Sequence, residues 1–125
     1  MSKIVIIGAG AMGSAFALPC LDNNHDINII GTHLENDSID QLKNNNNLHP
    51  GLNTKIPQEI KIFKFEKFNE LLKSNVDLIV LGISSKGIEW AADQLSSLYK
   101  DNKIPKLLML TKGLSIHNNK YELLV

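Results

Sequence analysis

The sequence predicts an α/β fold in which a doubly wound parallel sheet lies between two layers of helices. Two apolar runs, Ile4–Ile7 and Val76–Ile83, are rich in β-branched side chains, which is typical of strands buried on both faces. A helical pattern follows each run after a short link. Strands that alternate with helices in this way are joined by right-handed crossovers, and these build a three-layer αβα domain.

Length and composition limit the number of domains, the kinds of partner and the cellular compartment. The chain has 125 residues, which suits one domain over residues 1–125. Lys plus Arg and Asp plus Glu number 13 each, so the net charge indicates neither nucleic acid nor a membrane as partner. The single cysteine, Cys20, excludes an internal disulfide and fits a reducing compartment. No apolar run approaches a signal peptide or the roughly 20 residues of a membrane span, so we expect a cytoplasmic protein.

The first half of the chain predicts a helix, a strand and a second helix. The first helix is expected over residues 10–21, where Pro19 removes a backbone donor and predicts a kink or an early end. A strand over 26–31 follows. The asparagine run at 44–47 lacks periodicity, so we expect a loop or a frayed helix end there.

The second helix is expected over residues 36–44. Asp37 or Ser38 is the expected N-cap, because both side chains can accept a hydrogen bond from a free backbone N–H group. Ile39 and Leu42 are expected to face the core.

The second half continues the alternation. Alternating apolar and basic residues predict a strand over 60–65, and apolar spacing predicts a short helix ending near Ser74. The expected order is then a strand over 76–83, a helix over 87–99, a strand over 106–110, and a polar loop with the start of another element over 115–125. On the helix over 87–99, one apolar face is expected to hold Ile88, Ala91, Ala92, Leu95 and Leu98, with Trp90 partly buried.

The first strand leads directly into three glycines, Gly8, Gly10 and Gly13, with the spacing G-x-G-x-x-G. Gly8 permits a tight turn, Gly10 lets a pyrophosphate approach the backbone, and Gly13 lets the helix pack close to the strand. The free N–H groups near Ala11 and Met12 then face the phosphates. This context predicts a Rossmann-type dinucleotide site, and a purely structural tight turn is the alternative.

The end of the second expected strand bears on the choice between NAD and NADP. An acidic residue about 20 positions past the glycines usually holds the ribose hydroxyls in NAD-specific domains. That position falls near Thr32, nineteen residues past Gly13, and neither Thr32 nor His33 is acidic. Glu35 is expected to lie already in the loop. The sequence therefore leans toward NADP or dual use, unless Thr32 and His33 merely begin a loop.

Ligands of such sheets bind outside the carboxyl ends of the strands. Four segments are expected to meet there, namely 8–13, 31–33, 82–86 and 111–113. Within the last of them, Lys112 can neutralise a phosphate or polarise a carbonyl oxygen, and a solvent-facing lysine is the alternative. No metal site is expected, because no other ligand type clusters near His49.

The chain as a whole resembles the N-terminal domain of NAD(P)-dependent glycerol-3-phosphate dehydrogenase. The resemblance rests on the segments GAGAMGSAFA, IIGTH, HPGLNTKIPQEI, VDLIVLGISSKGIEWA and LLMLTKGL. The Thr-Lys-Gly-Leu ending is the most specific of these. The resemblance implies an oxidoreductase of glycerophospholipid metabolism, which transfers hydride between NAD(P)H and dihydroxyacetone phosphate or glycerol 3-phosphate.

The resemblance also implies roles for particular residues. It places the cofactor against Gly8, Gly10, Ala11, Met12, Gly13, Thr32, His33, Ser84, Ser85 and Lys112, and makes Lys112 catalytic as well. The family carries a second catalytic lysine in a helical C-terminal domain, which these 125 residues lack. The chain is therefore expected to be a fragment that is inactive alone, whose partners are that domain and a small phosphorylated three-carbon substrate. Whether the chain forms a homodimer is left open by the sequence.

Two other functions stay open from the sequence. A ketopantoate reductase shares GAGAMG, although Thr111-Lys112-Gly113 is out of place in it. A stand-alone nucleotide-sensing domain that regulates a partner would explain the short length, but it would normally keep an acidic residue at the end of the second strand.

Overall fold

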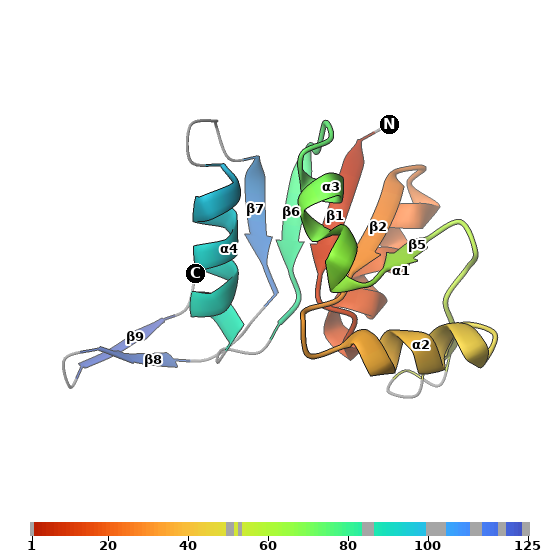
Figure 1. The fold of residues 1–125 in the computed structure, drawn as a ribbon, viewed down its shortest axis with the longest axis horizontal. Helices are drawn as coiled ribbons and strands as arrows, with labels where there is room; N and C mark the ends of the chain where they lie inside the picture. The colour runs from red at the N-terminus through yellow and green to blue at the C-terminus, as the bar shows by residue number, and fades with distance from the viewer. Residues whose placement is uncertain are drawn as a thin grey trace.

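The computed structural model describes residues 2–49, 52, 54–83, 87–99, 105–110, 114–117 and 120–123. Five parallel strands form the central sheet, in the order β5 (Lys61–Phe63), β2 (Asp26–Ile30), β1 (Lys3–Ile7), β6 (Leu78–Leu81) and β7 (Lys106–Met109). Their arrowheads point to one end of the molecule, where α2 lies (Figure 1). The strand order turns back at β1, so the predicted doubly wound sheet is confirmed.

Helices connect these strands, and two small antiparallel pairs accompany the sheet. The helices are α1 (Ala11–Asp22), α2 (Asn36–Asn44), α3 (Phe68–Leu72) and α4 (Ile88–Leu98), with a 3-10 turn η1 (Phe65–Lys67) before α3. The pairs are β3 (Leu48–His49) with β4 (Thr54–Lys55), and β8 (Leu114–His117) with β9 (Lys120–Leu123). The pair of β8 and β9 agrees with the expected start of another element within residues 115–125, but it corrects the expectation of a polar loop there.

The core has two halves, one on each face of the sheet. Side chains of β1 alternate between them, because successive residues of a strand point to opposite faces. Ile4 and Ile6 pack with the buried residues of α1 and α2, whereas Val5 and Ile7 pack with those of α3 and α4. Each of the four is at most 4% exposed. The helices therefore cover both faces, as the continuous apolar run of β1 predicts.

Two expectations about helices α1 and α2 are wrong. Of the kink or early end expected at Pro19, the early end is wrong, since helix α1 continues past Pro19 to Asp22. Pro19 and Ala15 are both exposed, so the Ala15 carbonyl that loses its partner can bond to water. Helix α2 has the expected bounds and buries Ile39 and Leu42, but its N-cap is Glu35 and makes no side-chain cap hydrogen bond.

Three further predictions concern the loop after α2, the lengths of two strands and the buried face of α4. The asparagine run forms a turn in which Asn46 and Asn47 adopt positive φ angles of 54° and 61°, which asparagine tolerates better than most residues. The strands near 60–65 and 76–83 are shorter than expected and cover only 61–63 and 78–81. On α4, Ala92 is exposed, contrary to expectation, whereas Trp90 is partly buried as expected.

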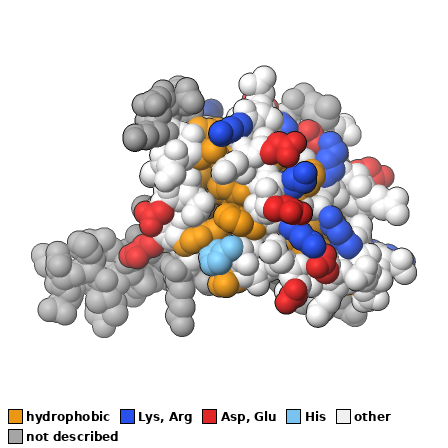
Figure 2. All heavy atoms as spheres, in the orientation of Figure 1, with side chains coloured by type: hydrophobic (Ala, Val, Ile, Leu, Met, Phe, Trp, Pro, Cys, Tyr) orange, Lys and Arg blue, Asp and Glu red, His pale blue; other side chains and the backbone are white. Residues whose placement is uncertain are grey.

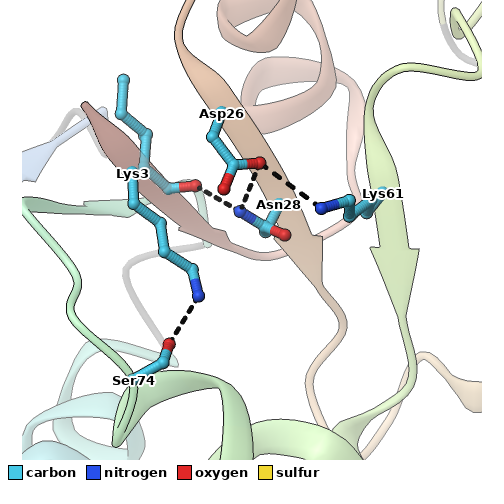
Figure 3. A network of polar contacts seen from close by, with 6 residues as sticks. Lys3, Asp26, Asn28, Lys61 and Ser74 are labelled. Carbon is cyan, nitrogen blue, oxygen red and sulfur yellow. Dashed lines mark hydrogen bonds and ion pairs between the residues drawn. The ribbon is translucent and has the colours of Figure 1, made fainter. Parts of the chain in front are cut away.

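A polar network joins the strands near their amino ends (Figure 3). The buried Asn28 donates to the Ile4 carbonyl and to Asp26, each over 3.4 Å. Asp26 also pairs with Lys61 at 3.7 Å, and Lys3 Nζ donates to Ser74 Oγ at 2.6 Å. Because ligands of parallel sheets bind at the carboxyl ends, this network serves the fold rather than the site.

Close packing at the carboxyl end of β6 predicts a stability effect. A Cβ atom on Gly82 would lie 2.9 Å from Gly13 Cα and 3.2 Å from Gly13 N, both backbone atoms that cannot swing aside. We expect Gly82→Ala to cost about 1–3 kcal/mol and to lower the Tm by roughly 5–10 °C in calorimetry. Gly87→Ala is the matched control, because its Cβ would meet Ile83 at 3.4 Å, an ordinary contact. Equal Tm values for the two variants would contradict this packing.

Candidate functional site

Backbone hydrogen bonds bring the glycine turn and the ends of β2 and β6 to one edge of the sheet. Gly8 donates to Ile30 O at 2.8 Å, and Gly82 donates to Ile7 O at 2.9 Å. Gly31 donates to the last residue of β5 in the same way, at 2.9 Å. Each glycine thus extends the ladder by one residue past its strand, so three of the four predicted segments meet.

The fourth predicted segment follows β7. Leu110 donates to Leu81 O at 3.0 Å, so the chain reaches the same edge just before Thr111. Residues 111–113, with Lys112, lie outside the described residues, and so do Ser84 and Ser85. The predicted roles of these three side chains therefore stay predictions.

Three glycines at the turn lie in close contact with one another, whereas Gly10 has open space beside its Cα atom. Gly8 has a φ of 113°, and a Cβ there would lie 2.5 Å from Gly82 O. A Cβ on Gly13 would lie 2.7 Å from Gly8 O. By contrast, a Cβ on Gly10 would meet no atom of the described residues within 4 Å. Gly8, Gly13 and Gly82 are therefore required by packing, whereas Gly10 is required only if something else occupies the space above it.

The start of α1 borders that space. Gly10 is the N-cap of α1, and it provides no side-chain hydrogen bond to the first N–H groups. Met12, in the first turn, is 42% exposed. Uncapped N–H groups at a helix start carry a partial positive charge and can bind an anion. The predicted place of the phosphates, near Ala11 and Met12, is at this helix start and stays a prediction.

Thr32 and His33 lie directly after β2 and Gly31, but they face different surroundings. Thr32 is 9% exposed, and its Oγ1 accepts the Leu34 N–H at 3.3 Å. The exposed His33 ring lies 4.9 Å from the Trp90 ring and 6.0 Å from the Phe65 ring, measured between centroids. Figure 2 shows a histidine ring bordered by hydrophobic side chains on this face. A cluster of aromatic rings, tilted by 40° to 68° to one another, thus adjoins the end of β2.

Glu35 corrects the expectation that no acidic group lies at the end of β2. Its carboxylate accepts the Thr32 N–H at 2.9 Å and the Ala9 N–H at 3.2 and 3.3 Å. Glu35 therefore bridges the end of β2 and the glycine turn, although its chain position places it in the loop before α2. A search slightly beyond the counted position would have found it, since it lies 22 residues past Gly13.

Other reactive groups give no second site within the described residues. Burial raises the pKa of the Cys20 thiol, so little thiolate is present at neutral pH and Cys20 is a poor nucleophile. Among the residues that the structure describes, no three His, Cys, Asp or Glu side chains gather closely enough to hold a metal ion. No helix in this part of the chain is long and apolar enough to cross a membrane.

The parallel sheet, the glycine turn after its first strand and the uncapped helix start define a Rossmann-type nucleotide-binding domain. The family model described as NAD-dependent glycerol-3-phosphate dehydrogenase N-terminus matches residues 3–124. The chain therefore belongs to this family, as its N-terminal domain.

Individual proteins to which the chain is similar are named glycerol-3-phosphate dehydrogenases. The NADP(+)-dependent glycerol-3-phosphate dehydrogenase of Archaeoglobus fulgidus is 30% identical over 116 residues, which cover 93% of this chain and 33% of that protein. The glycerol-3-phosphate dehydrogenase [NAD(P)+] of Fusobacterium nucleatum is 31% identical over 115 residues, which cover 91% and 32%. The chain thus spans about a third of the length of these relatives.

Solved structures show the same fold. The crystal structure of glycerol-3-phosphate dehydrogenase from Coxiella burnetii matches with a TM-score of 0.73 at 22% identity, over 91% of this chain and 33% of that one. A ternary structure of D-mandelate dehydrogenase with NADH and anilino(oxo)acetate matches with a TM-score of 0.63 at 28% identity, over 90% and 34%.

Proposed function

We propose that this chain is the cofactor-binding part of an enzyme that transfers hydride between NAD(P)H and dihydroxyacetone phosphate or glycerol 3-phosphate. The observation that carries the proposal is the open space above Gly10, beside the uncapped start of α1. A pyrophosphate fits there because Gly10 presents no Cβ and the first N–H groups of α1 can donate to it. Relatives named for NAD(P)-dependent oxidation of glycerol 3-phosphate support the substrate.

Most of these residues bind the cofactor, and one, Lys112, takes part in the chemistry. The glycine turn with Ala11 and Met12 binds the pyrophosphate, and Thr32 and His33 contact the adenosine half. Ser84 and Ser85 contact the nicotinamide half. Lys112 binds the substrate or its reacting oxygen, where a positive charge stabilises the negative charge that develops on a carbonyl oxygen as hydride arrives. A single cysteine in the chain supports a reducing compartment, and we place the protein in the cytoplasm.

Titration of the chain with NADH and NADPH, followed by nicotinamide fluorescence, tests the cofactor proposal. We expect saturable binding of at least one of the two. Dihydroxyacetone phosphate and ketopantoate are then added to the cofactor complex of this chain joined to the remaining two thirds of a relative. A response to dihydroxyacetone phosphate alone supports the proposed substrate. A response to ketopantoate alone, or cofactor-dependent assembly without any substrate response, would assign the domain to a reductase or a sensor instead.

Thr32 offers a test of the adenosine site. Thr32→Asp adds a negative charge after β2, which repels the 2′-phosphate of NADPH but has no such partner in NADH. We expect NADPH affinity to fall about tenfold further than NADH affinity. Thr32→Asn is the matched control, because it has the shape of aspartate without its charge, and either side chain can accept the Leu34 N–H as Thr32 does. Equal losses of NADH and NADPH in Thr32→Asp would refute the placement of the ribose.

A further inference from the structure

Side-chain hydrogen bonds hold both the N–H group and the carbonyl group of Ala9, in the middle of the glycine turn. The Ala9 N–H donates to both oxygens of Glu35, at 3.2 and 3.3 Å. The Ala9 carbonyl lies 2.9 Å from His49 Nε2 and accepts from Ser14 Oγ at 3.3 Å. A carbonyl oxygen only accepts, so His49 Nε2 carries the proton in this contact.

The partners of Ala9 come from separate parts of the chain. Glu35 precedes α2, His49 ends β3, and Ser14 lies on α1. His49 and Ser14 are 7% and 0% exposed. Backbone pairing of His49 with Thr54 on β4 fixes the strand that carries the imidazole. The turn is therefore connected to α2 and to the β3–β4 pair, in addition to its own helix.

A cavity of about 340 Å³ adjoins the turn on the same side. Ala9, Gly10, Glu35 and His49 are among the residues that line it. The cavity leaves one side of Ala9 and Gly10 without close packing, whereas Ala9, which is 9% exposed, packs into the core on its other side. On the cavity side, hydrogen bonds from His49 and to Glu35 hold the Ala9 peptide groups.

We propose that His49 and Glu35 are positioning residues that set the affinity for the cofactor by fixing the Ala9 peptide. This inference rests on the proposed function, since it deepens the assignment of the pyrophosphate to the start of α1. The Ala9 N–H is occupied by Glu35, so the phosphates use the N–H groups further along, near Ala11 and Met12. Those groups are presented correctly only while the Ala9 peptide keeps its orientation, because the turn leads directly into α1.

Two substitutions test His49, and they differ in whether the new side chain has a hydrogen-bond donor. His49→Leu fills the same buried volume without a donor, and His49→Gln keeps an N–H group near the position of Nε2. We expect His49→Leu to weaken NADH and NADPH binding alike, by about tenfold, and His49→Gln to restore affinity to within about threefold of the unsubstituted chain. Fluorescence titration gives the affinities, and calorimetry gives the Tm of each variant.

Rescue by glutamine separates positioning from general stability. If His49→Leu and His49→Gln bind the cofactors as tightly as the unsubstituted chain, the inference about His49 is wrong. The same holds if both variants lose affinity equally at equal Tm, because the donor then has no role. Absence of binding by the unsubstituted chain would instead overturn the proposed function itself.

Glu35 is tested against Asp37, an exposed acid at the first turn of the same helix. Glu35→Ala and Asp37→Ala remove one negative charge each, but only Glu35 contacts the Ala9 and Thr32 N–H groups. We expect Glu35→Ala to weaken both cofactors about tenfold and Asp37→Ala to leave them within about twofold. Amide hydrogen exchange at Ala9 and Thr32 should speed up only in Glu35→Ala. Equal affinities in the two variants would overturn the role of Glu35.

Discussion

Gly10→Val is expected to keep the fold and to lose at least about a hundredfold of its affinity for NADH and NADPH. A Cβ at Gly10 meets no atom within 4 Å in the part of the chain that the structure describes, so we expect the folded chain to accommodate it. The added side chain would fill the space in which we place the pyrophosphate, and the phosphates would lose two or more charge-assisted hydrogen bonds to the start of α1. Each such bond contributes about 1.5–3 kcal/mol, so two account for the expected loss.

A matched substitution at Gly13 gives the opposite result. Its Cβ would lie 2.7 Å from Gly8 O and 3.1 Å from the Ile6 side chain, where the helix crosses the first strand. We therefore expect Gly13→Val to unfold or strongly destabilise the domain, with a far lower Tm than Gly10→Val. Fluorescence titration and calorimetry on both variants check the pair. Undiminished cofactor affinity in a folded Gly10→Val variant would contradict the placement of the phosphates.

The second large effect concerns turnover. The 125-residue chain is expected to bind the dinucleotide and to show no measurable oxidation of glycerol 3-phosphate. Hydride transfer requires a substrate held beside the nicotinamide and a group that accepts the hydroxyl proton. Among the converging segments only Lys112 is proposed for such a contact, and the chain spans about a third of the length of its relatives. General acid–base help alone is worth about 10²–10⁴ in rate, and losing substrate orientation costs more.

Turnover is expected to return when the remaining two thirds are supplied from a relative, in one chain or as a second polypeptide. Within that longer protein, Lys112→Ala should lower kcat/KM by at least about a hundredfold, measured from NAD(P)H absorbance. Lys106→Ala is a control, because this lysine lies exposed on β7. Robust turnover by the isolated chain, after host enzymes are removed, would show that the reaction or its catalytic residues are assigned incorrectly.

Local patterns alone predict much of the fold. The apolar runs of β1 and β6, the helix over residues 36–44 and the glycine spacing each depend on residues close together in the chain. Strand and helix periodicity act over such short stretches, so these predictions agree with the structure. The parallel sheet with helices on both faces follows as well, because right-handed crossovers join alternating strands and helices.

Other features could not be predicted from residues close together in the chain. Helix α1 continues past Pro19 because that residue is exposed and the carbonyl that loses its partner can bond to water. Gly82 has no local motif, yet its close approach to Gly13 allows only glycine. Neither property can be found from the neighbouring residues, since each depends on which surface another part of the chain covers.

The sequence by itself determined the fold class, the alternation of strands and helices along the chain and the turn at Gly8, Gly10 and Gly13. Only the tertiary structure decided the surroundings of that turn. Glu35 and His49 lie 26 and 40 residues from Ala9, and the positions of α2 and of the β3–β4 pair bring them to it. Hydrogen bonds require donor and acceptor within about 3 Å, and no spacing along the chain encodes such a distance between separate elements.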